Sequence, residues 1–99
     1  MKYRPDIVII YDILSALDRE GKPISYIVTK SNMPNPRVRE RIKIMIENGL
    51  VEEFEDKNGR KLYRITDKGV KARSRIKEMI LFLREIGLLR YDKIDEELR

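Results

Sequence analysis

The sequence predicts a small, mostly helical α+β domain, in which three helices come first, a two-stranded hairpin follows and a long helix ends the fold. Three observations point to this fold class. Apolar residues recur at helical spacing in the first half of the chain, an Asn58-Gly59 pair separates two strand-like stretches, and the segment after them carries a heptad-like apolar pattern. With 99 residues there is room for one hydrophobic core. We divide the chain into residues 1–66, with the first helices and the hairpin, and residues 67–99, with the long helix and a tail.

The first two helices are predicted before residue 32. Apolar residues at helical spacing indicate a helix from about Asp6 to Arg19, with Asp6 as its N-cap and Gly21 as its stop signal. Residues 25–29 are rich in β-branched side chains and are also compatible with a strand. We interpret them as a short helix capped by Ser25, because of the elements predicted on both sides.

The third helix has the clearest boundaries. Asn35 is a suitable N-cap, and Pro36 suits the first helical position. Gly49 ends the helix, and Leu50 is placed for the hydrophobic contact that often accompanies a C-terminal glycine. The apolar residues that fall on its core-facing side are Val38, Ile42, Met45 and Ile46.

The hairpin is predicted around Asn58-Gly59, which favours a two-residue type I′ turn. Such a turn places one aromatic pair and two pairs of opposite charge directly across the strands, which is a favourable register. The expected pairs are Phe54 with Tyr63, Glu53 with Arg64, and Asp56 with Lys61.

The last helix begins at a cap, Thr66 or Asp67, and continues to about Ile86, just before Gly87. Its apolar residues step by four, three, four and three, as in a short coiled-coil seam. Flanking apolar residues, among them Phe82, widen this stripe beyond what one contact requires. We therefore expect one side of the stripe to pack on the first helix and the other to meet a second copy of the chain. The predicted dimerisation residues are Ala72, Ile76, Met79, Ile80, Leu83 and Ile86.

The composition argues against an enzyme. The chain contains neither Cys nor His, which removes the thiol nucleophile, the disulfide and the commonest general base and metal ligands. Carboxylates remain, but no cluster of them has the spacing of a metal site. We therefore expect no catalytic residue, no metal, no cofactor and no evident small-molecule ligand. Many charged residues together with no Gln or Cys are typical of thermophiles.

No segment indicates export or membrane insertion. The apolar run at residues 7–10 is far shorter than a membrane-spanning helix and lacks the features of a secretory signal. We therefore expect a cytoplasmic protein without a membrane partner.

The charge is concentrated in one part of the chain. The formal net charge is +5, but residues 57–77 alone hold nine Lys or Arg and one acid, so that this segment carries +8 and the remainder −3. Such an asymmetry is typical of a surface that follows phosphates. The ordinary alternative is a solvated flank of a helix, and we favour it for Lys77.

The order of these elements resembles a winged helix-turn-helix. The resemblance covers about residues 7–86 and rests on Ile-Glu-Asn-Gly-Leu-Val at 46–51 and on Asn-Gly-Arg-Lys-Leu-Tyr-Arg-Ile-Thr-Asp-Lys-Gly at 58–69. The chain is most similar to small archaeal winged-helix DNA-binding proteins that dimerise through a C-terminal antiparallel coiled coil. In that family the last helix is long, whereas Gly87 interrupts it here, which leaves the length of the coiled coil open.

The resemblance implies a homodimeric, nucleoid-associated transcription regulator that binds double-stranded DNA. A helix at about 35–48 would enter the major groove, and a wing tip at 57–61 would lie on the minor groove or on phosphates. Arg37 and Arg39 are candidates for reading guanine, whereas Asn35 fits a capping role better than adenine reading. The predicted DNA-binding residues are Asn35, Arg37, Arg39, Arg41, Lys43, Lys57, Asn58, Arg60, Lys61, Lys68 and Lys71.

Two other functions stay open. A chromatin-type protein would bind mainly the DNA backbone, without preference for a sequence. A winged-helix protein-interaction module would never insert its third helix into a groove, although the basic segment argues against this. RNA binding has little support, because the aromatic residues are few.

Overall fold

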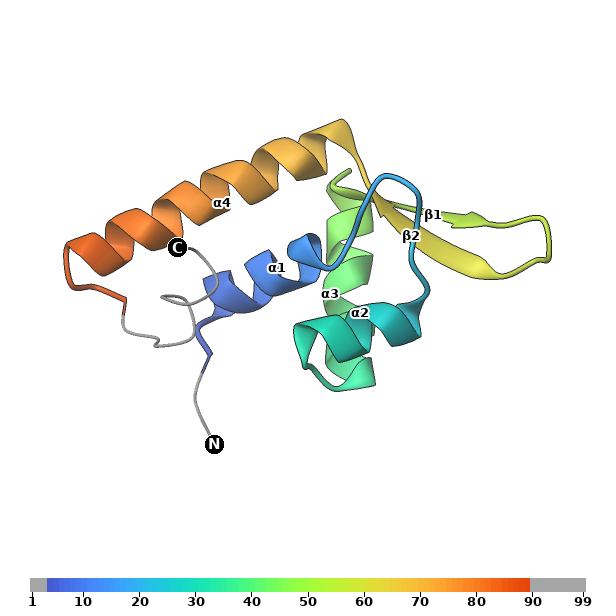
Figure 1. Cartoon of the computed structure of the whole chain (residues 1–99), viewed down its shortest axis with the longest axis horizontal. Helices are drawn as coiled ribbons and strands as arrows, with labels where there is room; N and C mark the ends of the chain where they lie inside the picture. Colours follow the sequence, from blue (N-terminus) through green and yellow to red (C-terminus); the bar gives the residue numbers. More distant parts are fainter. Residues whose placement is uncertain (1–3, 90–99) are drawn as a thin grey trace.

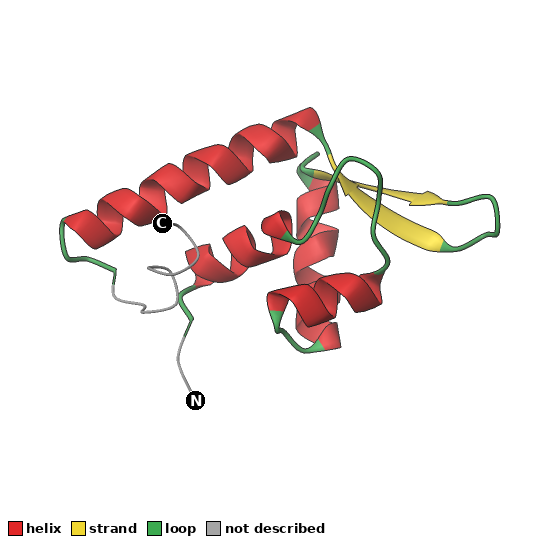
Figure 2. Ribbon diagram, in the orientation of Figure 1, coloured by secondary structure: helices red, strands yellow, loops and turns green. Residues whose placement is uncertain are grey.

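The computed structural model describes residues 4–89, so the tail predicted beyond them lies outside the described residues. In chain order its elements are α1 (Asp6–Ser15), α2 (Ile24–Ser31), α3 (Asn35–Glu47), β1 (Val51–Glu55), β2 (Lys61–Ile65) and α4 (Asp67–Glu85). Figure 1 shows α4 running alongside α1, while the hairpin of β1 and β2 projects from the opposite end of the molecule. Figure 2 shows that helices dominate and that the hairpin holds the strands. The predicted fold class is confirmed.

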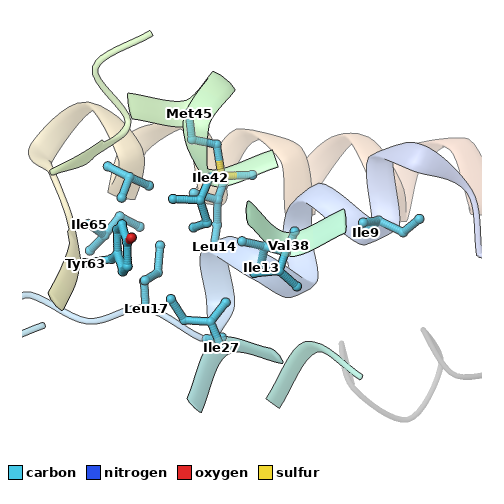
Figure 3. Packing of buried hydrophobic residues seen from close by; sticks show 12 residues of the cluster. Ile9, Ile13, Leu14, Leu17, Ile27, Val38, Ile42, Met45, Tyr63 and Ile65 are labelled. Carbon is cyan, nitrogen blue, oxygen red and sulfur yellow. The ribbon is translucent and has the colours of Figure 1, made fainter. Parts of the chain in front are cut away.

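The main core lies where α1, α2, α3 and β2 meet. Figure 3 shows Ile13 and Leu14 of α1 together with Ile27 of α2, and all three side chains are fully buried. Val38 of α3 and Ile65 of β2 close the cluster. Each of these side chains contributes about 1.5–3 kcal/mol through burial, so the apolar periodicity of the sequence accounts for how the helices assemble.

A second, smaller cluster fixes α4 along α1. Ile80 of α4 is fully buried together with Val8 of α1 and Leu89, which follows the helix. Gly87 has a φ of +79°, a conformation that side-chain-bearing residues adopt at a cost, and it reverses the chain at the end of α4. The reversal brings Leu89 back onto the cluster, so the interruption predicted at Gly87 has a packing role within the chain.

The first three helices begin at prolines instead of at the predicted side-chain caps. Pro5, Pro23 and Pro34 occupy the N-cap positions of α1, α2 and α3, and no side chain caps any of these helices. The caps predicted at Asp6, Ser25 and Asn35 are therefore wrong. The reason is that each proline holds the extended backbone of an N-cap position, so the helix begins at the residue after it.

Helix α1 is also shorter than predicted, since it ends at Ser15 and not at Arg19. The Asp18 carboxylate accepts hydrogen bonds from the backbone amides of Glu20 and Gly21, at 3.0 and 2.8 Å. These bonds organise a turn that competes with continued helix, as short acidic side chains often do.

The hairpin is present, but its register differs by one residue from the prediction. Phe54 pairs with Leu62, Glu53 with Tyr63 and Glu52 with Arg64. The predicted pairs Phe54–Tyr63, Glu53–Arg64 and Asp56–Lys61 are therefore wrong. Both charge pairs change partners: Arg64 lies 2.6 Å from Glu52, and Lys61 lies 3.8 Å from Glu53.

The cause of the shifted register is the turn. Asp56 and Arg60 pair through the backbone at 2.9 Å, which leaves a three-residue loop. The Asp56 carboxylate accepts from the backbone amides of Asn58 and Arg60, both at 2.9 Å. Only Gly59 takes a positive φ, of +78°, whereas a type I′ turn needs two such residues. The loop is therefore a type I turn followed by a glycine bulge.

The predicted end of α3 and the predicted start of α4 are confirmed, and the two lie next to each other. Gly49 ends α3 with a φ of +74°, and the amide of Leu50 donates to the carbonyl of Met45 at 2.9 Å, as in a glycine cap. Thr66 caps α4 by accepting from the amide of Gly69 at 3.0 Å, and it donates to the Gly49 carbonyl at 2.6 Å. One hydroxyl thus joins the end of α3 to the start of α4.

Candidate nucleic-acid interface

Helix α3 has one face in the core and one face open to solvent. Val38, Ile42 and Met45 are buried, as the sequence predicts. The exposed residues of α3 are Asn35, Pro36, Arg37, Arg39, Glu40, Lys43, Ile44 and Glu47. This face is the part of the helix-turn-helix that a DNA groove can receive.

The basic residues of α3 differ in whether they already have a partner within the protein. Arg37 and Lys43 are exposed and form no ion pair within residues 4–89. Arg39 donates from Nε to the Asn35 side-chain oxygen at 2.6 Å, so the Asn35 side chain holds Arg39 instead of capping the helix. Free cations therefore remain at the first turn and in the middle of α3.

Arg41 is not freely available. It forms an ion pair with Asp6 at the start of α1, its side chain is only 22% exposed, and its Nε has no hydrogen-bond partner within residues 4–89. The DNA contact predicted for Arg41 would have to displace Asp6. The structure instead gives Arg41 a role in holding α3 against α1.

The hairpin tip carries unpaired positive charge. Lys57 and Arg60 are exposed and form no ion pair within the described part of the chain, and Asn58 lies exposed between them. Lys61 is exposed as well, but its ammonium group forms an ion pair with the Glu53 carboxylate. Of the predicted tip cations, Lys57 and Arg60 are the ones that stay open to an anion.

The two predicted DNA-binding cations of α4 also differ in whether they have a partner. Lys71 is exposed and unpaired within residues 4–89. Lys68 donates from Nζ to the carbonyl of Asn48 at 2.9 Å, at the C-terminus of α3. A cation is favourable there because the last helical carbonyls carry partial negative charge. Lys68 therefore links α4 to α3 in addition to any contact with DNA.

Sequence reasoning missed Arg4, which positions the turn before α3. Its guanidinium lies 2.6 Å from the Asp12 carboxylate and donates to the carbonyls of Ser31 and Asn32, both at 2.7 Å. Both side chains of the ion pair are nearly buried, at 11% and 9% exposed. Asn32 has a φ of 53° and ends α2. The only hint in the sequence was a lone acid within the apolar pattern of the first helix.

The base of the hairpin is held by a second network. Lys22 pairs with Tyr63 through two backbone hydrogen bonds of 2.8 and 2.9 Å, which form an isolated antiparallel β-bridge beside β2. Backbone hydrogen bonds from Gly21 and Glu20 and the nearby Lys22 ammonium hold the pKa of Asp18 below its ordinary value. The loop between α1 and α2 therefore anchors β2.

Tyr63 connects the hairpin electrostatically to α3. Burial raises the pKa of the Tyr63 hydroxyl, and a hydrogen bond with Glu53 raises it further. The Arg39 guanidinium acts in the opposite direction. The environment of the Tyr63 hydroxyl therefore includes charged groups of both β1 and α3.

Some of the predicted dimerisation residues pack within the chain, and others remain exposed. Ile80 is fully buried within the chain and offers no surface to a second copy, so its assignment is corrected. Ile76 and Leu83 are half-buried against the chain's own core. Met79 and Ile86 are exposed, and Ala72 is half-buried. Phe82, at 53% exposed, joins the outward side.

No helix within residues 4–89 is long and apolar enough to cross a membrane. In the same residues no three acidic side chains gather closely enough to hold a metal ion.

Known structures share this fold at low sequence identity. Sso10a-2, a DNA-binding protein from Sulfolobus solfataricus, matches with a TM-score of 0.79 and 24% identity over 97% of this chain and 98% of that chain. The transcriptional regulator BldR from the same organism matches with a TM-score of 0.71 and 20% identity over 91% and 66%. MepR, a transcription regulator of a Staphylococcus aureus multidrug efflux pump, matches with a TM-score of 0.64 and 15% identity over 92% and 69%.

The family is established by the sequence. No curated protein sequence matches the chain. A model of the winged helix-turn-helix family matches residues 3–84, which confirms the resemblance drawn from the motifs at 46–51 and 58–69. The chain therefore belongs to the winged helix-turn-helix family.

Proposed function

We propose that the protein is a transcriptional regulator that binds double-stranded DNA, with α3 in the major groove and the hairpin tip on the minor groove or on flanking phosphates. One observation carries the proposal. Unpaired, exposed cations lie on α3, at Arg37 and Lys43, and again on the hairpin tip, at Lys57 and Arg60. Arginine at the start of a groove-bound helix suits guanine, and lysine suits phosphate.

The shape of the relatives supports the same function. Sso10a-2 is described as a DNA-binding protein, and BldR as a transcriptional regulator. The excess of positive charge at residues 57–77 matches a polyanionic partner. Such a regulator acts in the cytoplasm, in association with the nucleoid.

The protein acts as a homodimer in this proposal. Met79, Phe82 and Ile86 are spaced by three and four residues and form an exposed apolar stripe on the C-terminal half of α4. Lys71 and Arg75 lie on the N-terminal half of the helix and are exposed. A parallel pair of α4 helices would bring these cations of two copies together, whereas an antiparallel pair separates them.

The antiparallel arrangement also suits the repeat of DNA. Phe82 and Lys71 are separated by about 16 Å along the helix, from a rise of about 1.5 Å per residue. Two copies centred on Phe82 therefore place their Lys71 side chains roughly 33 Å apart. This spacing is close to one turn of B-DNA, about 34–36 Å, so that the two Lys71 side chains can reach phosphates about one helical turn apart.

A chromatin-type protein that binds mainly the DNA backbone is the second candidate. The observation in its favour is the likeness, over almost the full length of both chains, to Sso10a-2, which is described as a DNA-binding protein and not as a regulator. The two candidates differ in the ratio between the affinity for one site and the affinity for bulk DNA.

Titration of labelled duplex DNA at several salt concentrations tests the DNA contact. We expect Lys43→Ala to weaken binding to all sequences about equally and to reduce the slope of log affinity against log salt by about one. Arg37→Ala should instead relax sequence preference. Lys77→Ala is the matched control, because Lys77 is exposed on α4 and is expected to touch no DNA. A slope that falls equally in Lys43→Ala and Lys77→Ala contradicts the placement of α3.

Light scattering after size exclusion tests the dimer. Wild-type protein should have twice the mass of one chain, and Phe82→Asp should have the mass of one. Leu81→Asp is the control, because Leu81 is also exposed on α4 but lies outside the stripe. A dimer that persists in Phe82→Asp would place the contact elsewhere.

A further inference from the structure

Glu40 and Ile44 lie on the exposed face of α3 without a role in the fold. Glu40 forms no hydrogen bond or ion pair within residues 4–89. Ile44 is 46% exposed and belongs to neither core cluster. Because the two positions differ by four, their side chains lie on the same side of the helix, about 6 Å apart along its axis.

Ile44 differs from the other large exposed apolar residues in residues 4–89. Five of them lie in α4 or directly after it, where the proposed dimer contact accounts for the main stripe. Tyr26 in α2 has the Lys22 ammonium 5.0 Å from its ring centre. Ile44 alone stands on α3, so a partner for it has to be something that the exposed face of α3 meets.

Glu40 is unexpected on a surface that binds only phosphates. A carboxylate that approaches DNA is repelled by the backbone whatever the base sequence. Arg37 and Lys43 are each three residues away, and neither forms an ion pair with Glu40. In the major groove a carboxylate becomes favourable where it accepts a hydrogen bond from the exocyclic amine of cytosine. Glu40 therefore weakens binding to DNA in general and favours sites that present a cytosine to it.

We infer that Glu40 and Ile44 determine base specificity, Glu40 by accepting a hydrogen bond from the N4 amine of a cytosine and Ile44 by packing on the methyl group of a thymine in an adjacent base pair. The major groove presents both groups. Base pairs stack about 3.4 Å apart, and a helix in the major groove runs at an angle to the DNA axis, so two side chains about 6 Å apart along the helix reach base pairs about one step apart. The inference rests on the proposed DNA binding and adds that the protein distinguishes such sites from bulk DNA.

Selection of bound duplexes from a random pool, with the full chain, tests both contacts. Wild-type protein should select a cytosine beside a thymine. In Glu40→Ala, the preference for cytosine over other bases at this position should fall about tenfold. The same variant should bind random DNA a few-fold more tightly at low salt, because a repulsive charge is gone. Ile44→Ala should keep the cytosine and lose the thymine. Glu78→Ala and Leu81→Ala, which make the same and a closely similar change at exposed positions of α4, should select like the wild type.

The thymine contact has a sharper test in one selected site. Deoxyuridine in place of that thymine removes only the methyl group. We expect wild-type affinity to fall about fourfold, the value of one buried methyl or methylene group, and the affinity of Ile44→Ala to stay unchanged. Equal losses in both proteins would overturn the assignment of Ile44.

The outcomes separate this inference from the proposed function. If the wild type binds duplex DNA but selects no sequence, or if both variants select as it does, the inference fails and DNA binding stands. If the wild type binds no duplex DNA at low salt, the proposed function fails and the inference falls with it. Equal thermal unfolding temperatures of wild type and variants, expected because both side chains are exposed, exclude loss of fold as the cause.

Discussion

Replacing Gly69 by alanine should test why the fold needs glycine in the first turn of α4. A β-carbon at this position would lie 2.1 Å from the carbonyl oxygen of Leu50 and 2.6 Å from Cγ1 of Ile65. The first of these atoms belongs to the backbone just after α3. Thr66 holds this backbone in place, because its amide donates to the Leu50 carbonyl and its hydroxyl donates to the Gly49 carbonyl. Neither neighbour can move away without disturbing the junction of α3, β2 and α4.

The magnitude follows from two opposing effects. Alanine is favoured over glycine within a helix by up to about 1 kcal/mol, so an open position would be stabilised. Forcing an extra carbon into a packed site costs about 1–3 kcal/mol, and the upper end applies here because the approach to Leu50 is closer than any ordinary contact. We therefore expect Gly69→Ala to lower the free energy of unfolding by about 2 kcal/mol, which lowers Tm by roughly 10 °C in a domain of this size.

Thermal and urea unfolding followed by circular dichroism measure this change. Gly59→Ala is the matched control, because nothing lies within 4 Å of its added carbon and only its positive φ, of +78°, opposes the substitution. That control should cost about 1 kcal/mol. If Gly69→Ala unfolds at the wild-type temperature or above it, the close approach of α4 to the Leu50 carbonyl is wrong.

Two further predictions concern the networks that position α3 and the hairpin. Arg4→Ala removes a nearly buried ion pair and the donor to two carbonyls at the end of α2, so urea denaturation should show a loss of about 3 kcal/mol. A loss below about 1 kcal/mol would mean that Arg4 does not hold the turn before α3. Asp18→Asn should destabilise the protein near pH 7 by under about 1 kcal/mol, since the carboxylate is partly exposed. Because the folded-state pKa of Asp18 lies below its ordinary value of 3.8, its contribution is present above that value and is lost as the pH falls through the folded-state pKa. Unfolding curves of wild type and Asp18→Asn should therefore converge toward pH 2, and a constant gap would contradict the cause assigned to the shift.

Local patterns predicted the elements of the fold well. Helical periodicity places the buried residues of α3, and Gly49 and Thr66 mark helix ends through interactions within a few residues of themselves. The hairpin was located by Asn58-Gly59, but its register depended on the Asp56 carboxylate, which satisfies two turn amides and shifts every pair by one. The helix starts were missed because proline was read only as a first helical residue.

The sequence by itself determined which elements form, that the chain holds a winged helix-turn-helix, and where its positive charge gathers, because periodicity, turn residues and charge are properties of neighbouring residues. Only the tertiary structure decided which side chains are free to act. Arg41 meets Asp6 across 35 positions of sequence, Lys68 reaches the Asn48 carbonyl, and Ile80 turns inward while Phe82 stays exposed. A one-dimensional apolar stripe cannot reveal which side packs inward, and a single charge cannot reveal its partner. Both depend on contacts between segments that only the assembled fold brings together.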